Sequence, residues 1–151
     1  MSKNNTYLSP LFLENINKSE VSTIIECGAA DGEDTVGIYN HYNANVYAFE
    51  CDPTLLLILR KKADSRIHVI ENGLWSEECS REFLCVDRDK SVNKTMGISS
   101  MYKWANLPGE NARNPLYLIQ TPILVQCTAI DAFCEKNDVH PDMLWLDAQG
   151  S

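Results

Sequence analysis

The residues best placed to do chemistry are two acids, each at the end of a short apolar run. The run 23–25 ends in Glu26, and the run 46–49 ends in Glu50. Between them lies the turn Gly28-Ala-Ala-Asp-Gly32, whose small residues let the backbone approach a ligand closely. A strand, such a turn, a helix and a second strand that ends in an acid together predict a nucleoside pocket at the edge of an α/β sheet.

The acids also indicate which ligand would fit this pocket. Glu50 can accept hydrogen bonds from both ribose hydroxyls, and each charge-assisted bond contributes roughly 1.5–3 kcal/mol. The amides that begin the next helix favour a negative group. However, Asp31 puts a carboxylate where a diphosphate would lie, and the glycine pattern of a dinucleotide site is missing. An amino-acid tail beside a sulfonium suits the turn better, which points to S-adenosyl-L-methionine. The alternative is an ordinary tight turn, with Glu50 as a surface carboxylate.

The elements that must position these residues follow from the hydrophobic pattern. Three buried strands are expected over 21–27, 46–50 and 67–71, and helices between them over 34–41 and 53–63. This alternation favours a parallel sheet with right-handed crossovers. Apolar residues at roughly helical spacing over 9–17 indicate a short leading helix. We therefore expect a helical lead-in over 1–20, followed by one domain over 21–151.

The alternation changes in the second half of the chain. Two further strands are expected over 81–86 and 123–127. The long polar segment 87–115 between them is typical of a functional lid or of disorder. A helix over 129–136 and a fourth core strand over 143–146 follow, and this strand ends in Asp147.

Five segments together resemble the FkbM-type family of S-adenosylmethionine-dependent methyltransferases, in order and in spacing, from about residue 22 onward. They are Glu26-Cys-Gly-Ala-Ala-Asp-Gly-Glu-Asp-Thr35, Val46-Tyr-Ala-Phe-Glu-Cys-Asp-Pro53, Gly97-Ile-Ser-Ser-Met101, Thr128-Ala-Ile-Asp-Ala-Phe133 and Leu144-Trp-Leu-Asp-Ala-Gln-Gly150. Three positions depart from the family pattern. Glu26 replaces Asp, Ala30 replaces Asn, and Cys51 stands where Pro is common.

The resemblance implies a Rossmann-like class I methyltransferase fold and transfer of a methyl group to a hydroxyl of a small-molecule or glycan acceptor. It implies that the cofactor is held by a set of residues around its methionine, ribose and adenine parts, and that two serines lie on the substrate side. The cofactor residues are Glu26, Gly28, Ala29, Asp31, Gly32, Glu50, Cys51, Asn72 and Gly73, and the serines are Ser99 and Ser100. Asn72 suits an adenine edge because its amide both donates and accepts, or it simply ends the strand as a turn residue.

Asp147 is the candidate catalytic residue. An aliphatic hydroxyl must lose its proton as it attacks, and a carboxylate at a strand tip can take that proton. Asp147 is alternatively an orienting group, a metal ligand or a structural carboxylate. His140 is a rival base, but it precedes Pro141 in a connecting loop. No spacing of His, Cys and acids is typical of a metal site, so none is expected.

Composition excludes other classes of protein. The chain has 151 residues and a formal net charge of −8, which argues against nucleic acid as a partner. The apolar stretches are too short to span a membrane. The six cysteines form no Cys-x-x-Cys motif and are interpreted as free thiols in a reducing compartment, so we expect a cytoplasmic protein.

Two other functions and the extent of the domain stay open on these grounds. The chain is alternatively a non-catalytic S-adenosylmethionine-binding module or inactive fragment, or, less favoured, an NAD-dependent oxidoreductase. A methyltransferase sheet has seven strands, and the pattern contains four core strands, so we expect the domain to be truncated after the fourth. The acceptor and the oligomeric state do not follow from the pattern.

Overall fold

A four-stranded parallel sheet forms the centre of the molecule. The computed structural model describes residues 13–91, 97–103 and 118–148. The sheet consists of β1 (Thr23–Cys27), β2 (Asn45–Phe49), β3 (Ile67–Ile70) and β7 (Met143–Leu146), in the order β3-β2-β1-β7. All three neighbouring pairs are parallel, so the expected α/β fold with a mostly parallel, Rossmann-like sheet is confirmed.

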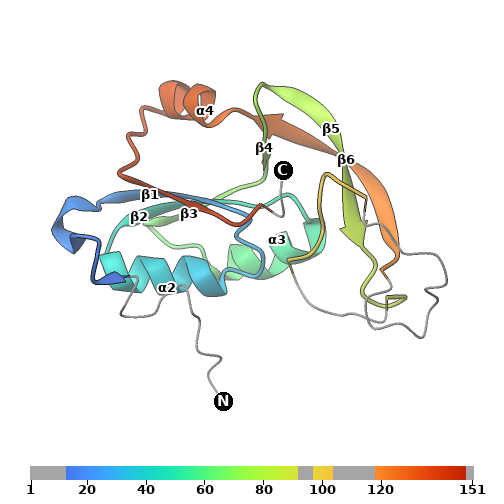
Figure 1. The fold of residues 1–151 in the computed structure, drawn as a ribbon, viewed down its shortest axis with the longest axis horizontal. Helices are drawn as coiled ribbons and strands as arrows, with labels where there is room; N and C mark the ends of the chain where they lie inside the picture. Colours follow the sequence, from blue (N-terminus) through green and yellow to red (C-terminus); the bar gives the residue numbers. More distant parts are fainter. Residues whose placement is uncertain (1–12, 92–96, 104–117, 149–151) are drawn as a thin grey trace, which may run out of the picture.

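Helices cover both faces of this sheet. Figure 1 shows α2 (Glu33–Tyr42) and α3 (Pro53–Leu59) on one face and α4 (Ile130–Asn137) on the other. A short 3-10 helix, η3 (Arg60–Lys62), continues α3 where a single helix to residue 63 was expected. Helices on both faces are what buries a parallel sheet, because the crossovers between its strands must pack against it.

The core follows the alternation of side chains along the strands. Ile24, Val46 and Ala48 point to the face that α2 and α3 cover, and they pack into one apolar cluster. Ile25 and Phe49 point to the opposite face, where they pack against Phe133 of α4. The alternation matters for the site, because neighbouring residues at the end of β1 point to different layers.

A second sheet lies beside the first. It consists of β4 (Gly73–Leu74), β5 (Cys79–Val86) and β6 (Gln120–Thr128), with β6 in the middle. β5 and β6 are antiparallel, and β4 runs parallel to β6. The two expected strands of the second half are therefore present as a pair, whereas the two-residue strand β4 was not expected.

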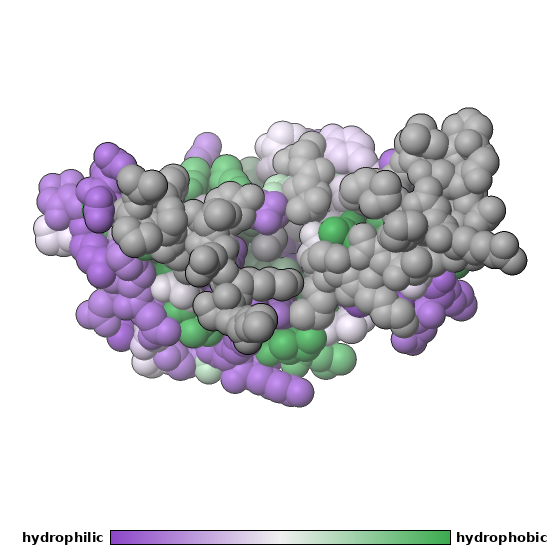
Figure 2. Space-filling view, turned by 60° about the horizontal axis from the view of Figure 1, so that its bottom comes forward, coloured by the Kyte–Doolittle hydropathy of each residue, from purple (hydrophilic) through white to green (hydrophobic). Residues whose placement is uncertain are grey.

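The remaining parts of the described chain are short. A 3-10 helix, η2 (Lys18–Glu20), precedes β1, and residues 9–12 of the helix predicted over 9–17 lie outside the described residues. No helix in the described ranges has both the length and the apolar character needed to cross a bilayer. Hydrophilic residues dominate one end of the face seen in Figure 2, and the apolar residues visible there form separate small areas.

Candidate functional site

A cavity of about 370 Å³ opens at the carboxyl ends of β1, β2 and β7. This volume lies in the range of small-molecule sites, and the location is the one at which open α/β sheets bind ligands. Most of the predicted site residues line it. They are Gly28, Ala29, Asp31, Glu50, Cys51, Asn72, Gly73, Ser99, Ser100 and Asp147. Glu26 and Gly32 are not on its wall.

Gly28 brings the end of β1 against the end of β7. Its φ of 81° lies in the left-handed region, and a Cβ there would stand 2.1 Å from the backbone oxygen of Asp147. The Asp147 N–H in turn donates to the carbonyl of Cys27 at 3.0 Å. Glycine at position 28 therefore allows the backbone of Asp147 to approach the turn that follows β1.

The amides of this turn are already bonded within the protein. The N–H groups of Gly28 and Ala29 both donate to the carbonyl of Phe49, at 3.1 and 3.0 Å. The Ala30 N–H donates to Glu50 Oε2 at 2.8 Å. The Glu33 N–H, at the start of α2, donates to Asp31 Oδ1 at 3.1 Å. The expectation from the sequence concerned the amides that begin the helix, and among these the Glu33 N–H is already bonded to Asp31.

Glu50 is buried and accepts three backbone hydrogen bonds. Besides the bond from Ala30, its Oε1 accepts from the N–H groups of Cys51 and Asp52, both at 2.7 Å. Burial raises the pKa of Glu50, and the three hydrogen bonds oppose that rise. A carboxylate has about four acceptor positions, so one remains for a ligand hydroxyl, whereas the sequence suggested that Glu50 would accept from two ribose hydroxyls.

Glu26 lies behind the turn rather than on the cavity wall. It points to the same face as Ile24, where the Thr35 hydroxyl of α2 donates to its Oε2 at 2.6 Å. Only 1% of Glu26 is exposed, and burial raises its pKa to about 7. The structure thus places Glu26 as a support that joins β1 to the first turn of α2, and the neighbouring Cys27 lines the cavity instead.

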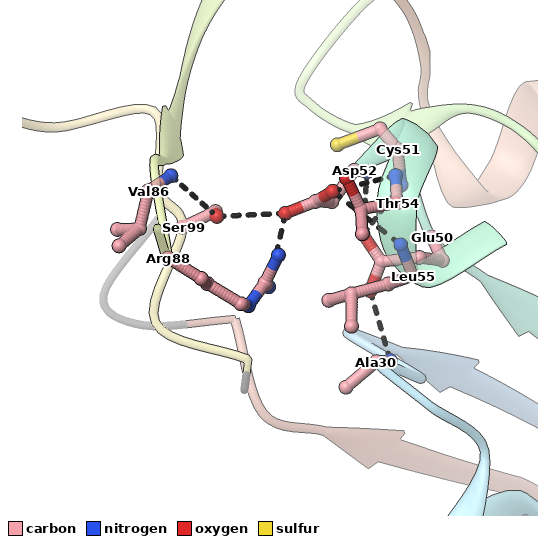
Figure 3. Close-up of polar contacts among 9 residues, drawn as sticks. All are labelled: Ala30, Glu50, Cys51, Asp52, Thr54, Leu55, Val86, Arg88 and Ser99. Atoms are coloured by element: carbon pink, nitrogen blue, oxygen red, sulfur yellow. Dashed lines mark hydrogen bonds and ion pairs between the residues drawn. The ribbon is translucent and has the colours of Figure 1, made fainter. Parts of the chain in front are cut away.

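Asp52 connects the tip of β2 to the second sheet (Figure 3). Its Oδ1 caps α3 by accepting from the Thr54 N–H at 2.9 Å. Its Oδ2 accepts from the Ser99 hydroxyl at 2.9 Å and pairs with Arg88 at 3.2 Å. Ser99 Oγ also accepts from the Val86 N–H, at the end of β5, at 3.0 Å. The polar chain therefore runs from the β2 tip to the opposite wall of the cavity.

That opposite wall combines two serines with apolar side chains. Ser100 forms a bridge to Leu84 of β5, with N–H to carbonyl distances of 2.8 and 3.3 Å, which fixes the stretch 97–101 on the second sheet. Leu55, Phe83 and Met101 supply apolar lining. Asp147 lines the cavity from the other side and is exposed.

Other candidates from the sequence do not join this site. The side chain of His140 is 89% exposed, pairs with Asp138 and is not part of the cavity wall. Within the described ranges, no three His, Cys, Asp or Glu side chains lie close enough together to hold a metal ion.

Sequence reasoning missed the pair of Asp52 and Arg88. The local signal for half of it was present, since an acid directly before Pro53 is typical of a helix N-cap with proline at the first helical position. Nothing local to Arg88 indicates its partner, because the two residues meet only when the second sheet packs beside the first.

Comparison with known proteins shows the family of this chain. The family model described as Methyltransferase FkbM domain matches residues 26–151. The chain belongs to this family. Among solved structures, the FkbM methyltransferase from Methylobacillus flagellatus KT is similar, with 18% identity and a TM-score of 0.47. The similarity covers 87% of this chain but 27% of the Methylobacillus flagellatus chain. This chain therefore spans about a quarter of the length of that protein. No curated protein sequence matches the chain.

Proposed function

We propose that this FkbM-family chain is an S-adenosylmethionine-dependent methyltransferase that methylates a hydroxyl of a small molecule or glycan. The observation that carries the proposal is the cavity at the strand ends, where Glu50, Asn72 and Asp147 converge around small residues. Family membership supports methyl transfer as the reaction. The six free cysteines support a reducing compartment such as the cytoplasm.

The donor and acceptor groups of the cavity suit this cofactor. Five acids line it, namely Asp31, Glu33, Asp34, Glu50 and Asp147. Negative charge favours a sulfonium and an ammonium group, and it disfavours a diphosphate. The remaining acceptor position of Glu50 suits a ribose hydroxyl, and Asn72 suits an adenine edge. The amides bonded to Phe49 and Glu50 further disfavour a dinucleotide such as NAD.

The location of Asp147 on the cavity wall supports a role as general base. It enters the cavity from the end of β7, beside the turn that would hold the cofactor. When bound, S-adenosylmethionine supplies an electrophilic methyl group. The acceptor hydroxyl must then be held in line with that group, which Ser99, Ser100 and the apolar wall support. As the hydroxyl oxygen attacks, its proton passes to the Asp147 carboxylate.

Titration calorimetry tests the cofactor. We expect S-adenosylmethionine and S-adenosylhomocysteine to bind with one site per chain and NAD to give no heat of binding. Binding of NAD alone would contradict the proposal and favour an oxidoreductase.

Transfer of a tritiated methyl group to a panel of sugars and other hydroxyl compounds tests the reaction. Incorporation into a hydroxyl acceptor supports the enzyme. Cofactor binding without incorporation into any acceptor favours the alternative, a binding module or inactive fragment.

A further inference from the structure

Two cysteines lie directly opposite each other in the second sheet. Cys79 of β5 and Cys127 of β6 are paired residues of the antiparallel ladder. Directly opposed residues have Cα atoms about 4.5 or 5.5 Å apart, depending on their hydrogen-bonding position. Both spacings fall within the roughly 4.4–6.8 Å that a disulfide spans. Among the described strands, no other ladder position sets one cysteine opposite another.

The two side chains also share a face and an environment. Both belong to the apolar cluster around Phe83 and Val125. Only 4% of Cys127 is exposed, whereas Cys79 is partly exposed. Burial raises the pKa of the Cys127 thiol, and the neighbouring Cys79 raises it further. A small oxidant is therefore expected to reach the Cys79 thiol first, and the buried Cys127 thiol lies beside it.

A surface hollow gives access to the pair. Cys79 and Cys127 both line it, together with polar neighbours that include Glu78, Ser80 and Gln126. Asn72 lines this hollow and the main cavity alike. A Cβ on Gly73 would stand 3.0 Å from the Cys127 sulfur. The pair thus lies directly behind the stretch assigned above to the adenine.

We propose that Cys79 and Cys127 are a redox-active pair that peroxide converts into a reversible disulfide. The Cys79 thiolate attacks one peroxide oxygen, the O–O bond breaks, and the departing hydroxide takes up a proton to give water. The Cys127 sulfur then attacks the resulting sulfenic acid. The S–O bond breaks, and the departing hydroxide leaves with the Cys127 proton as a second water. Two electrons pass from the two thiols to one peroxide, and a dithiol reductant reverses the change.

Peptide mapping of the folded chain tests this proposal. Trypsin is expected to release Cys79 in the peptide 67–81 and Cys127 in the peptide 114–136, which also contains Cys134. The Cys134→Ser variant therefore gives an unambiguous map and serves as the parent. After treatment with a small excess of hydrogen peroxide, we expect thiol titration to fall by two, a linked 67–81/114–136 peptide under non-reducing conditions, and full reversal by dithiothreitol.

Two controls make the result decisive. In the Cys127→Ser variant, Cys79 is expected to stop at the sulfenic acid, which dimedone traps on the peptide 67–81. In urea the preference for this pair is expected to disappear, because it depends on the folded ladder. Oxidation that links Cys79 to another cysteine, or that consumes other thiols while this pair stays reduced, would overturn the proposal.

Discussion

At the scale of single residues, Glu50 both accepts backbone hydrogen bonds and borders the proposed ligand site. Three backbone N–H groups already donate to its carboxylate, which lies at the edge of the cavity. These bonds hold the carboxylate in one orientation before any ligand arrives, and preorganisation of this kind reduces the entropy lost on binding. The same residue is therefore expected to influence both stability and affinity.

Replacing Glu50 tests whether its effects on stability and affinity come from its hydrogen bonds or only from its charge. In Glu50→Gln the amide group turns a donor toward at least one backbone N–H, which leaves that donor without its acceptor. We expect the free energy of unfolding in urea to fall by about 1–3 kcal/mol, together with weaker cofactor binding. Glu33→Gln removes a charge from an exposed acid of the same cavity wall and is expected to leave stability nearly unchanged. Equal losses in the two variants would contradict this role of Glu50.

The buried carboxyl group of Glu26 is expected to make the free energy of unfolding depend on pH. Its pKa in the folded protein is about 7, above the ordinary value of 4.5, so folding favours the protonated form. The stabilisation is complete below about pH 4.5 and is lost as the pH rises through 7, a change of roughly 3 kcal/mol. Urea denaturation at several pH values between these limits measures it. Glu26→Gln should flatten the curve, leaving the decline that Glu50 contributes in the same direction. An unchanged slope would show that Glu26 is not protonated in the fold.

Replacing Asp147 is expected to lower the rate of methyl transfer more than the affinity for the cofactor. Asp147→Asn keeps the shape of the side chain but removes its capacity to take a proton. We expect methyl transfer to fall by about 10²–10⁴-fold, the usual contribution of a general base, whereas cofactor affinity measured by calorimetry falls only by the smaller effect of removing one of the five acids that line the cavity. Transfer at the parent rate in this variant would assign Asp147 an orienting or structural role instead.

At the scale of elements, the contact between the ends of β1 and β7 sets the geometry of the site. Gly28 is the point of closest approach, since any side chain there would meet the Asp147 carbonyl. Parallel strands so far apart in sequence depend on such contacts to fix their ends, and here the contact also positions the candidate base.

A pair of glycine variants measures this contact. Gly28→Ala combines a left-handed φ of 81° with the backbone collision, so a loss of about 3 kcal/mol or more is expected. Gly97 has a similar φ of 75°, but its Cβ would stand 3.4 Å from Ala30 Cβ. Gly97→Ala should therefore show the backbone strain alone, about 1–2 kcal/mol. Thermal and urea unfolding give both values, and equal losses would exclude the close approach as the cause.

At the scale of the whole molecule, two sheets have to be held at a fixed distance for the cavity to exist. Asp52 and Ser99 join them, since one caps α3 at the end of the parallel sheet and the other accepts from Val86 in β5. A mutation in this link should therefore loosen one sheet relative to the other before it affects either core.

Hydrogen exchange tests this coupling. Ser99→Ala leaves the buried Val86 N–H without its acceptor, so we expect a loss of about 1–3 kcal/mol and faster exchange in β5 and β6 than in β2. Ser80→Ala is the matched control, because it removes a serine of β5 whose exposed hydroxyl is bonded to Gln126. Uniform loss of protection across both sheets in Ser99→Ala would contradict a specific link.

Local patterns predicted the parallel sheet and the acids at its edge for a clear reason, whereas Asn72, Ser99 and Ser100 were expected only from the family resemblance. Apolar runs that end in acids mark strand ends, and parallel strands gather their carboxyl ends at one edge, which brought Glu50 and Asp147 together. The same patterns did not reveal that Glu26 faces α2, because the face of a strand residue depends on the register of the sheet. They also missed Arg88 and the two-residue strand β4, since both are defined only by long-range packing.

The bonded turn after β1 limits how this protein could be redesigned or could diverge. A change of Asp31 alone would remove a repulsive charge, yet the amides of Gly28, Ala29 and Ala30 would still point at Phe49 and Glu50. A switch of preference to a phosphate-bearing cofactor would therefore require several simultaneous changes, including loss of the Glu50 carboxylate that stabilises the fold. The proposed preference for S-adenosylmethionine therefore rests on the backbone of this turn, and single substitutions are expected to abolish binding before they redirect it.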